Sequence, residues 1–266
     1  MKILFIGDIF GNTGRRVLAE RLPSIINDFG IDVCVGNGEN VSGGRGMTKN
    51  YFRKLRKYGL NVITGGNHSF SIEDKDFSFM GEPQVLRPIN YPQGNIGHGS
   101  TIHTLEDGRS IGVINLIGRT FMHEIPDCPF RVCIDAINEL KQKTPIILID
   151  FHAEASSEKA ALAWHIDGMA SAVIGTHTHV QTADERILPK GTAFITDAGM
   201  TGPEASIIGM KPEGVIKKYL LQTYVRFEPS EEGAMLNGVI VDVDDVSGKA
   251  LSISRIFERV TFDDTL

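Results

Sequence analysis

The sequence predicts an α/β protein in which two packed β-sheets are flanked by helices, as one domain over residues 1–266. Short apolar runs alternate with helical periodicity in the first part of the chain, which is typical of parallel strands joined by helices. Hairpin patterns in the middle and near the end add antiparallel strands. The sequence contains no linker, internal repeat or low-complexity stretch, so one domain fits better than two in tandem.

The opening part of the chain is predicted to form three strands separated by two helices. Gly30 and Gly59 are the expected helix stops, and Thr48 is the expected cap of the second helix. This order predicts a parallel sheet with right-handed crossovers. The five elements are expected at residues 2–7, 15–29, 32–36, 48–58 and 61–64.

The rest of the chain starts with a Pro- and Gly-rich stretch, residues 81–99, which is expected to form a long ordered loop. A hairpin follows, with its turn at residues 106–109. Further helices are expected at about 130–143, from Ser156 or Ser157 to about Gly168, and at about 213–222. Further strands are expected at 100–105, 110–117, 145–150, 172–175, 185–188 and 193–196, with a last pair across the turn at 245–248.

Composition and charge limit the partners of the protein. The 266 residues include 27 Lys and Arg against 33 Asp and Glu, a formal net charge of −6. A broad cationic surface for long nucleic acid or for anionic lipid is therefore not expected. The hydrophobic fraction of 41% is enough for a large core and excludes a disordered chain.

Cysteine usage and the N-terminus indicate the compartment. Cys34, Cys128 and Cys133 form no C-x-x-C pair and are too few for a disulfide framework. The apolar stretch before Asp8 is too short for a signal peptide, and no apolar run reaches membrane-spanning length. We therefore expect a cytoplasmic protein with reduced thiols and no membrane contact.

Potential metal ligands gather at the carboxyl ends of the predicted strands, where α/β proteins bind ligands. Carboxylate, amide oxygen and imidazole together suit first-row transition metals, and there are more of them than one four-coordinate ion requires. The pattern therefore predicts a two-metal site. The strand-end residues are Asp8, Glu39, Asn40, Asn67, His68, His152, His177 and His179.

Each residue also has a purely structural interpretation. Asp8 alone would more often be a cap or turn residue, and His68, after Gly-Gly-Asn, would often belong to a turn that needs positive φ. His152 is less easily explained this way, because it ends a buried apolar run. His177 and His179 are the most specific pair, since residues two apart in extended backbone point to the same side.

These motifs resemble, in order and spacing, those of the calcineurin-like metallophosphoesterases. Two positions depart from that pattern: Phe10 stands where the superfamily usually has a histidine ligand, and Glu39 replaces the bridging Asp. Both departures resemble the YmdB-type branch of this superfamily. The matching blocks, which span residues 1 to about 260, are D-I-F-G from Asp8, N-G-E-N from Asn37, G-N-H from Gly66, D-F-H-A-E from Asp150, G-T-H-T-H from Gly175 and D-A-G-M-T-G from Asp197.

The resemblance implies a fold, a cofactor and an activity. The implied fold is a four-layer α-β-β-α sandwich of two mixed sheets flanked by helices. The implied cofactor is a pair of divalent or trivalent transition-metal ions, iron first and manganese as the alternative. The implied activity is phosphodiesterase action on small cyclic nucleotides of the 2',3'-cyclic AMP or GMP type. Homo-oligomers, dimers or tetramers, are also implied.

Residue roles follow from the same resemblance. Glu39 would bridge the two ions, and Asn40 would supply an oxygen to the ion that lacks a ligand at Phe10. The ion without a histidine ligand at position 10 is expected to bind more weakly, or the metal preference of that position is expected to change. The implied ligands of the first ion are Asp8, Asn40 and His179, and those of the second are Asn67, His152 and His177.

The expected mechanism follows from charge. Two divalent ions and the carboxylates of Asp8 and Glu39 make a cationic pocket within an acidic protein, which would attract a small phosphodiester. A metal-bound hydroxide would attack phosphorus, and His68, beside Asn67 but not itself expected on metal, would protonate the leaving oxygen. The weaker candidates for substrate contacts are Asn12, Arg45, Arg119 and His123.

Three other functions compete with this one. A metal-free nucleotide-binding fold would use the Gly7–Gly14 stretch at a helix N-terminus, but it has no phosphate-binding motif and leaves the histidines unexplained. H-x-H also occurs in amidohydrolases, but at the first strand of a barrel rather than late in the chain. The main alternative is a metal-containing regulatory or nucleotide-binding protein with little turnover.

Overall fold

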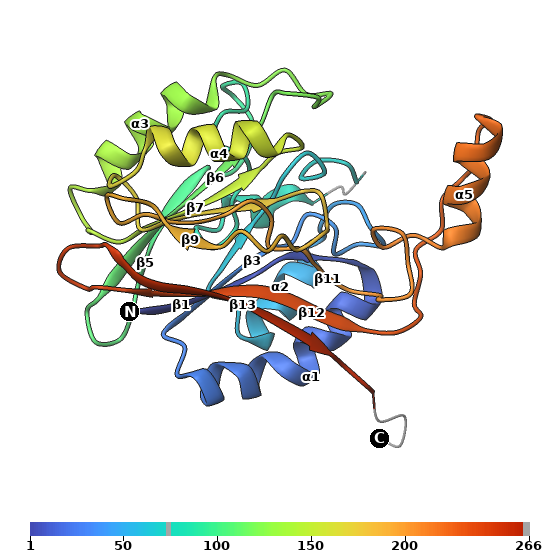
Figure 1. Cartoon of the computed structure of the whole chain (residues 1–266), viewed down its shortest axis with the longest axis horizontal. Helices are drawn as coiled ribbons and strands as arrows, with labels where there is room; N and C mark the ends of the chain where they lie inside the picture. Colours follow the sequence, from blue (N-terminus) through green and yellow to red (C-terminus); the bar gives the residue numbers. More distant parts are fainter. Residues whose placement is uncertain (73–75, 263–266) are drawn as a thin grey trace.

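The computed structural model describes residues 1–72 and 76–262, and in it two β-sheets lie face to face with helices on their outer sides (Figure 1). The four-layer α-β-β-α sandwich implied by the resemblance is confirmed, and both sheets are mixed. The domain predicted for residues 1–266 also includes residues 73–75 and 263–266, which lie outside the described residues.

The first sheet contains the parallel β-α-β-α-β opening that the sequence predicts. β1 (Lys2–Ile6) pairs in parallel with β3 (Val33–Asn37), which pairs in parallel with β4 (Val62–Thr64). On its other edge β1 pairs with an antiparallel hairpin from the end of the chain. The remaining elements are β12 (Met235–Val243) and β13 (Ala250–Arg259) in the sheet, and α1 (Gly11–Phe29) and α2 (Lys49–Tyr58) between its parallel strands.

The second sheet has a parallel centre and antiparallel edges. The hairpin of β5 and β6 forms one edge, and β9 pairs antiparallel with β10 at the other. Its strand order is β5 (Ser100–Thr104), β6 (Ser110–Ile117), β7 (Ile147–His152), β8 (Ala172–Thr176), β10 (Ala193–Ile195) and β9 (Arg186–Ile187). The helices along this half are α3 (Pro129–Leu140) and α4 (Ser156–His165), and a 3-10 turn, η1 (Phe77–Gly81), precedes it in the chain.

A third, two-stranded sheet was not predicted. β2 (Asp8–Ile9) pairs in parallel with β11 (Met200–Thr201), and the Asp8 amide donates to the Gly199 carbonyl at 2.9 Å. A Cβ at Gly7 would lie 2.1 Å from that same carbonyl oxygen, so only glycine fits there. This pairing fixes Asp8 at the junction of the two halves of the molecule.

Three apolar clusters fill the three interfaces between the four layers. Helices α1 and α2 pack on the first sheet, the two sheets pack on each other, and α3 and α4 pack on the second sheet. Leu148 of β7 lies in the middle cluster, whereas its neighbour Ile149 lies in the outer one. Because successive side chains point to opposite faces, a strand buried on both sides reads as a continuous apolar run.

The predicted ends of the first two helices and the cap of the second are confirmed, whereas α1 begins at Gly11 rather than at residue 15. Gly30 caps α1 in left-handed backbone, with φ of 61°, and Gly59 ends α2 with φ of 122°. The Thr48 side chain accepts from the Tyr51 amide at 3.4 Å, as expected of an N-cap. These residues specify helix ends through local geometry alone, which is why the sequence reveals them.

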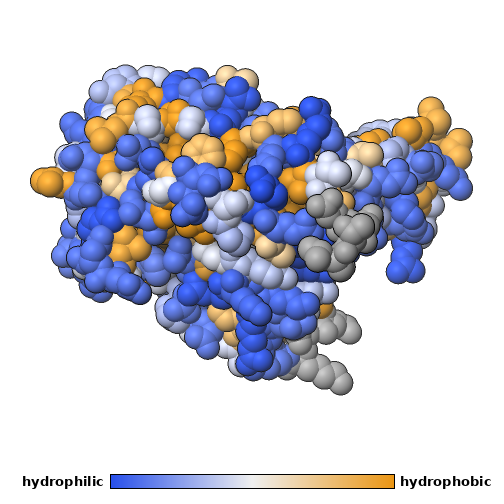
Figure 2. All heavy atoms as spheres, turned by 90° about the horizontal axis from the view of Figure 1, so that it is seen from below, coloured by the Kyte–Doolittle hydropathy of each residue, from blue (hydrophilic) through white to orange (hydrophobic). Residues whose placement is uncertain are grey.

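The short helix α5 (Pro212–Leu221) projects from the side of the sandwich (Figure 1). Ile216, Leu220 and Leu221 are exposed on it, and Figure 2 shows apolar side chains at that end of the molecule. Among residues 1–72 and 76–262, no helix has both the length and the apolar character needed to cross a membrane.

Truncation of a buried side chain between the two sheets tests the packing of the sandwich. Leu148→Ala should lower the free energy of unfolding by about 2–5 kcal/mol, because Leu148 is fully buried between the sheets and its loss leaves a cavity. Urea denaturation measures this change. Leu251→Ala, at a side chain that is 61% exposed on β13, is the matched control and should cost less than about 0.5 kcal/mol. Equal losses in the two variants would contradict the packing described.

Candidate metal centre

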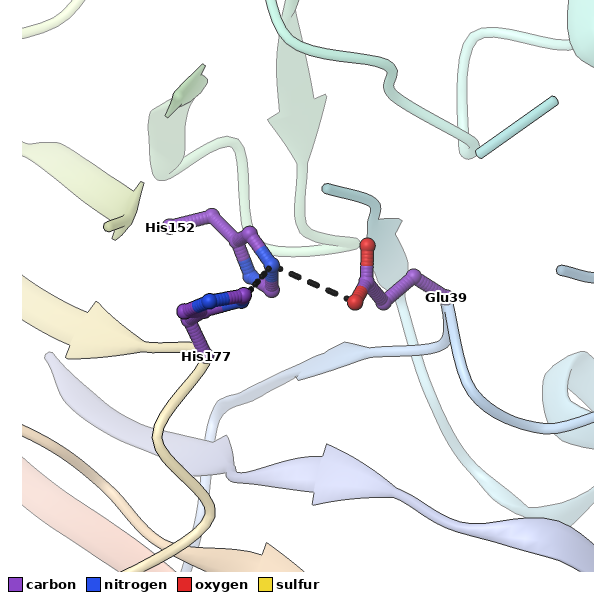
Figure 3. A group of neighbouring side chains, drawn as sticks. All are labelled: Glu39, His152 and His177. Carbon is purple, nitrogen blue, oxygen red and sulfur yellow. Dashed lines mark hydrogen bonds and ion pairs between the residues drawn. The ribbon is translucent and has the colours of Figure 1, made fainter. Parts of the chain in front are cut away.

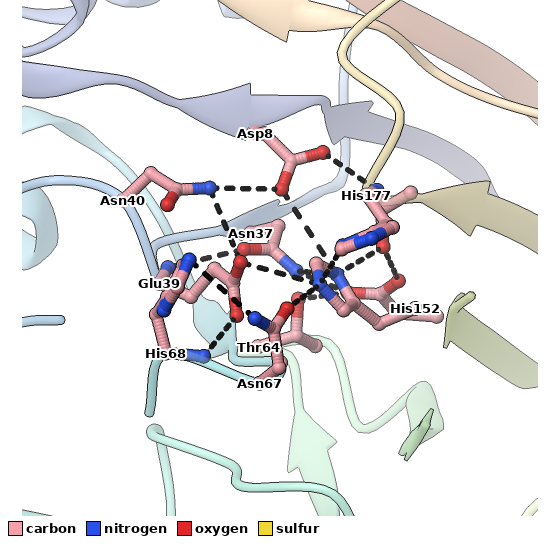
Figure 4. Close-up of polar contacts among 12 residues, drawn as sticks. Asp8, Asn37, Glu39, Asn40, Thr64, Asn67, His68, His152 and His177 are labelled. Carbon is pink, nitrogen blue, oxygen red and sulfur yellow. Dashed lines mark hydrogen bonds and ion pairs between the residues drawn. The ribbon is translucent and has the colours of Figure 1, made fainter. Parts of the chain in front are cut away.

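The strand-end side chains predicted from the sequence meet in one place, where ends of strands from both large sheets face the small sheet (Figure 4). Asp8 lies on β2, and the turns after β3 and β4 supply two residues each. The second sheet supplies His152 at the end of β7, and His177 and His179 after β8. The turn residues are Glu39, Asn40, Asn67 and His68.

One group of side chains surrounds the Asn40 amide. Its nitrogen lies 3.1 Å from His179 Nε2, 3.2 Å from Glu39 Oε1 and 3.4 Å from Asp8 Oδ1. His179 Nε2 is itself 3.8 Å from Asp8 Oδ1. The members of this group are the ligands that the resemblance implies for the first ion, together with Glu39.

A second group surrounds His152 (Figure 3). His152 Nε2 lies 2.9 Å from Asn67 Oδ1, 3.0 Å from His177 Nδ1 and 3.2 Å from Glu39 Oε1. Potential ligand atoms of Glu39, His152 and His177 all lie within 4.8 Å of one another. Glu39 Oε1 therefore touches both groups, which is where a bridging carboxylate would have to lie.

Charge at this position favours a bound cation. Asp8 and Glu39 are 0% and 2% exposed. Burial raises the pKa of Asp8, although the nearby imidazoles of His179 and His152 act in the opposite direction. Burial alone would also raise the pKa of Glu39, but the charge and hydrogen bond of His152 lower it to about 2, and the pKa of His152 rises to about 9 despite burial. Positive charge beside Glu39 is thus strongly stabilised.

In each imidazole of the two groups, the ring nitrogen that faces away from the group has a polar partner. The Nδ1–H of His179 donates to the Ile208 carbonyl at 3.0 Å, and Nε2 of His177 lies 3.2 Å from a carboxylate oxygen of Glu154. His152 Nδ1 lies 3.0 Å from the hydroxyl of Thr176. In each ring, the outer nitrogen can act as donor, which leaves the lone pair of the inner nitrogen free for a metal.

The residues behind His152 were missed by sequence reasoning. The carboxylate of Asp150 accepts from Asn37 at 3.0 Å, from Thr176 at 2.7 Å and from Thr64. Burial raises the pKa of Asp150 to about 7. A signal existed, because Asp150 lies two residues before His152 on one strand and so points to the same side. Glu154 was quoted only as part of a motif.

Phe10, at the position of the missing histidine ligand, has a packing role. Its side chain is 2% exposed, and its ring lies edge-on to the imidazole of His179 with a centroid distance of 5.8 Å. A Cβ at Gly209 or Gly44 would come within 2.5 Å or 2.8 Å of this ring. Phe10 therefore fills the space beside the first group and supports His179.

The backbone of the H-x-H motif differs from the expected one. The prediction assumed extended strand, but φ is 99° at His177 and 65° at His179, in the left-handed region. The imidazoles do converge, although through two strained residues rather than through strand alternation. The two-residue spacing correctly predicted that the imidazoles of His177 and His179 converge, but the expected extended backbone was wrong.

His68 lies at the edge of the second group and faces a cavity. Its backbone amide donates to Glu39 Oε2 at 2.9 Å, and its Nδ1 lies 3.1 Å from the Ser71 hydroxyl. The cavity has a volume of about 590 Å³, and Glu39, His177 and Arg45 also line it. The rest of its wall is largely apolar but also carries Lys218 of α5. The apolar lining residues are Phe10, Ile207, Ile208, Met210, Val215 and Phe227.

The weaker substrate-contact candidates separate into two kinds. Arg45 lines the cavity, and its charge helps to lower the pKa of His68, after the larger effect of burial. Asn12, Arg119 and His123 are exposed and are not among the described residues that line it. The Asn12 side chain instead accepts from Arg15 at 3.0 Å.

Comparison with known proteins identifies the family of the chain. A family model described as YmdB-like protein matches residues 4–256. The chain belongs to the YmdB-like family. The family's match covers the described strands that supply both groups of side chains.

Relatives of this YmdB-like protein include a named bacterial enzyme and proteins of known structure. It is 47% identical to the 2',3'-cyclic-nucleotide 2'-phosphodiesterase of Bacillus subtilis, over 96% of each chain. A phosphatase from Mycoplasma pneumoniae has a similar crystal structure, with a TM-score of 0.91, 34% identity and coverage of 97% and 93% of the two chains. A hypothetical protein from Thermus thermophilus matches with a TM-score of 0.90, 36% identity and coverage of 97% and 99%.

Metal addition tests the site. Mn²⁺ added to metal-free protein should raise the melting temperature, because a ligand that binds only the folded state stabilises it, by about 2.7 kcal/mol at a hundredfold excess over Kd. Differential scanning calorimetry measures the shift. Glu39→Gln removes the carboxylate shared by both groups and should reduce the shift strongly. An unchanged melting temperature of the wild-type protein on addition of Mn²⁺ would contradict metal binding at this site.

Proposed function

We propose that this protein hydrolyses small 2',3'-cyclic nucleotides in a site that holds two transition-metal ions. The observation that carries the proposal is the convergence of two donor groups on one carboxylate, Glu39, beside His68 and an open cavity. The 47% identity to a 2',3'-cyclic-nucleotide 2'-phosphodiesterase supports the same substrate class.

The donor set fits two ions of the kind expected. Asp8, Asn40 and His179 would hold the first ion, and Glu39 would bridge to the second. Its remaining ligands would be Asn67, His152 and His177. Mixed oxygen and nitrogen donors without thiolate favour iron, with manganese as the alternative. When bound, the ions would activate a water molecule and neutralise the phosphate oxygens.

The chain's own residues would then act on the leaving group. Hydrolysis adds water across the bond between phosphorus and the ribose 2' oxygen and leaves a nucleoside 3'-phosphate. The 2' oxygen needs a proton as that bond breaks, and the His68 ring, which lines the cavity, would donate it. The hydrogen bonds of His68 to Glu39 and Ser71 hold its backbone and ring in place for this step.

The cavity suits a small ligand. Its volume of about 590 Å³ lies within the usual range of small-molecule sites. Arg45 at its rim would face the phosphate, and the apolar wall would face the base. A net charge of −6 is compatible with such a ligand, because the positive charge is local to the site, but not with a long nucleic acid held by its backbone.

Some broader expectations remain proposals. We propose that residues 1–266 form one domain, that the protein is cytoplasmic and that it is a homo-oligomer, a dimer or a tetramer. The exposed apolar side chains of α5, Ile216, Leu220 and Leu221, support self-association.

The direct test is multiple turnover. Purified protein loaded with iron or manganese should release many equivalents of nucleoside 3'-phosphate per chain from 2',3'-cyclic AMP, and chromatography measures the product. Less than one equivalent would reject the proposal and favour the alternative of a regulatory protein that binds nucleotide with little turnover.

Removal of the proposed acid separates chemistry from metal binding. His68→Ala should lower kcat about 10²–10⁴-fold, the usual contribution of general acid catalysis, while metal content stays unchanged. Kinetics on 2',3'-cyclic AMP and metal analysis by mass spectrometry give the two readouts. His165→Ala, at an exposed residue that ends α4, is the matched control and should match wild type in both. Full activity in His68→Ala would exclude His68 as the acid.

Removal of one implied ligand should affect one ion. His177→Ala should lose the second ion and retain the first, because His177 contacts the His152 group and the first group keeps all its members. Metal analysis per chain shows the loss, with His165→Ala again as control. Retention of both ions would rule out His177 as a ligand.

A further inference from the structure

A buried ion pair lies directly behind the H-x-H turn. Lys159 of α4 and Asp197, which follows β10, are both fully buried, and Lys159 Nζ lies 2.8 Å from Asp197 Oδ2. Within residues 1–72 and 76–262, the hydrogen bonds of the Lys159 amine and the Asp197 carboxylate go to each other, to Thr178 and to Gly199 rather than to the donor groups described above. Charges withdrawn from water in this way persist only when they are paired, and such a pair adds little net stability compared with apolar packing. Its presence beside the metal centre therefore calls for another explanation.

The same carboxylate oxygen holds the residue between the two histidines. Asp197 Oδ2 accepts from the Thr178 amide at 3.1 Å and from the Thr178 hydroxyl at 2.8 Å. Its Oδ1 accepts from the Gly199 amide at 2.9 Å, which ties it to the segment that leads into β11. Three donors and one cation thus fix Asp197, and two of those donors belong to Thr178.

The backbone on either side of Thr178 needs such a restraint. His177 and His179 both have positive φ, which residues other than glycine rarely adopt without support from the surrounding structure. Extended backbone would change the directions of both rings. Hydrogen bonds to a charged acceptor are stronger than neutral ones, so Asp197 is well suited to hold this turn.

The end of β8 is shaped to admit the lysine. A Cβ at Gly175 would lie 2.9 Å from Lys159 Cδ and 1.8 Å from the Thr196 carbonyl oxygen. The lysine stem therefore passes over a position where no side chain fits, and its amine reaches Asp197.

We propose that Lys159 and Asp197 are positioning residues that lock the His177–Thr178–His179 turn in its strained conformation, so that both imidazoles face the metal centre. The inference rests on the proposed function, which makes His177 and His179 ligands of different ions. The Lys159–Asp197 pair would then orient one ligand of each ion, His179 of the first and His177 of the second. Outer contacts of this kind commonly change metal affinity about 10–100-fold.

Paired variants of Thr178 test the link without removing buried charge. Thr178→Val keeps the shape and loses the hydroxyl bond to Asp197, whereas Thr178→Ser keeps that bond. Isothermal titration of metal-free protein with Mn²⁺ should show about tenfold or greater loss of affinity in Thr178→Val and near-wild-type affinity in Thr178→Ser. Equal affinity in both variants would overturn the proposal.

A double variant separates positioning from stability. Lys159→Met with Asp197→Asn removes both charges together, so no unpaired charge is left buried. Mn²⁺ affinity should fall about 10–100-fold, while the urea midpoint of the metal-free protein stays close to that of wild type. A lower midpoint with unchanged Mn²⁺ affinity would show that the pair is only structural and would overturn the proposal.

A spectroscopic readout keeps this test separate from the proposed function. In metal-free protein, the ring ¹⁵N signals of His177 and His179 should move in Thr178→Val and in the double variant but not in Thr178→Ser, with the His165 signal as control. Unmoved signals would overturn the positioning role even if the enzyme is active. Wild-type protein that binds Mn²⁺ but does not turn over 2',3'-cyclic AMP would reject the proposed function and leave the positioning role supported.

Discussion

The buried carboxylate of Glu39 is the constraint on which the site depends. It lies between the Asn40 group and the His152 group, at 3.2 Å from a member of each, and is almost fully withdrawn from water. An ionised carboxylate in such a place must be compensated by nearby positive charge. The imidazoles, the amides and the residues that orient them are arranged around this requirement.

The two-sheet architecture makes such a site possible. Parallel strands of both sheets direct their carboxyl ends to one edge, so residues far apart in the chain meet there. Apolar layers on both faces of each sheet keep the strands rigid. The small sheet of β2 and β11 places Asp8 opposite the larger sheets. A site supported in this way can be held closely enough for metal chemistry.

Local charge and overall charge have different consequences here. The chain is acidic overall, yet two bound ions would make the cavity cationic, with Arg45 at its rim. The same cavity combines polar side chains, including His68 and Lys218, with an apolar wall to which α5 contributes Val215. Phe10 contributes to that wall, and its ring packs edge-on against the imidazole of His179.

The sequence by itself determined most of the elements and the candidate residues that the fold brings together, but not the small sheet of β2 and β11. Helix ends depend on local residues such as Gly30 and Thr48, and strands buried on both faces leave unbroken apolar runs, so both are visible without a structure. The ligand candidates stood out because polar side chains at the ends of such runs are unusual. Only the tertiary structure decided the left-handed backbone of His177 and His179, the support of Asp197 for the turn and the network around Asp150. Those features depend on contacts between residues 19 to 113 positions apart, which no local pattern encodes.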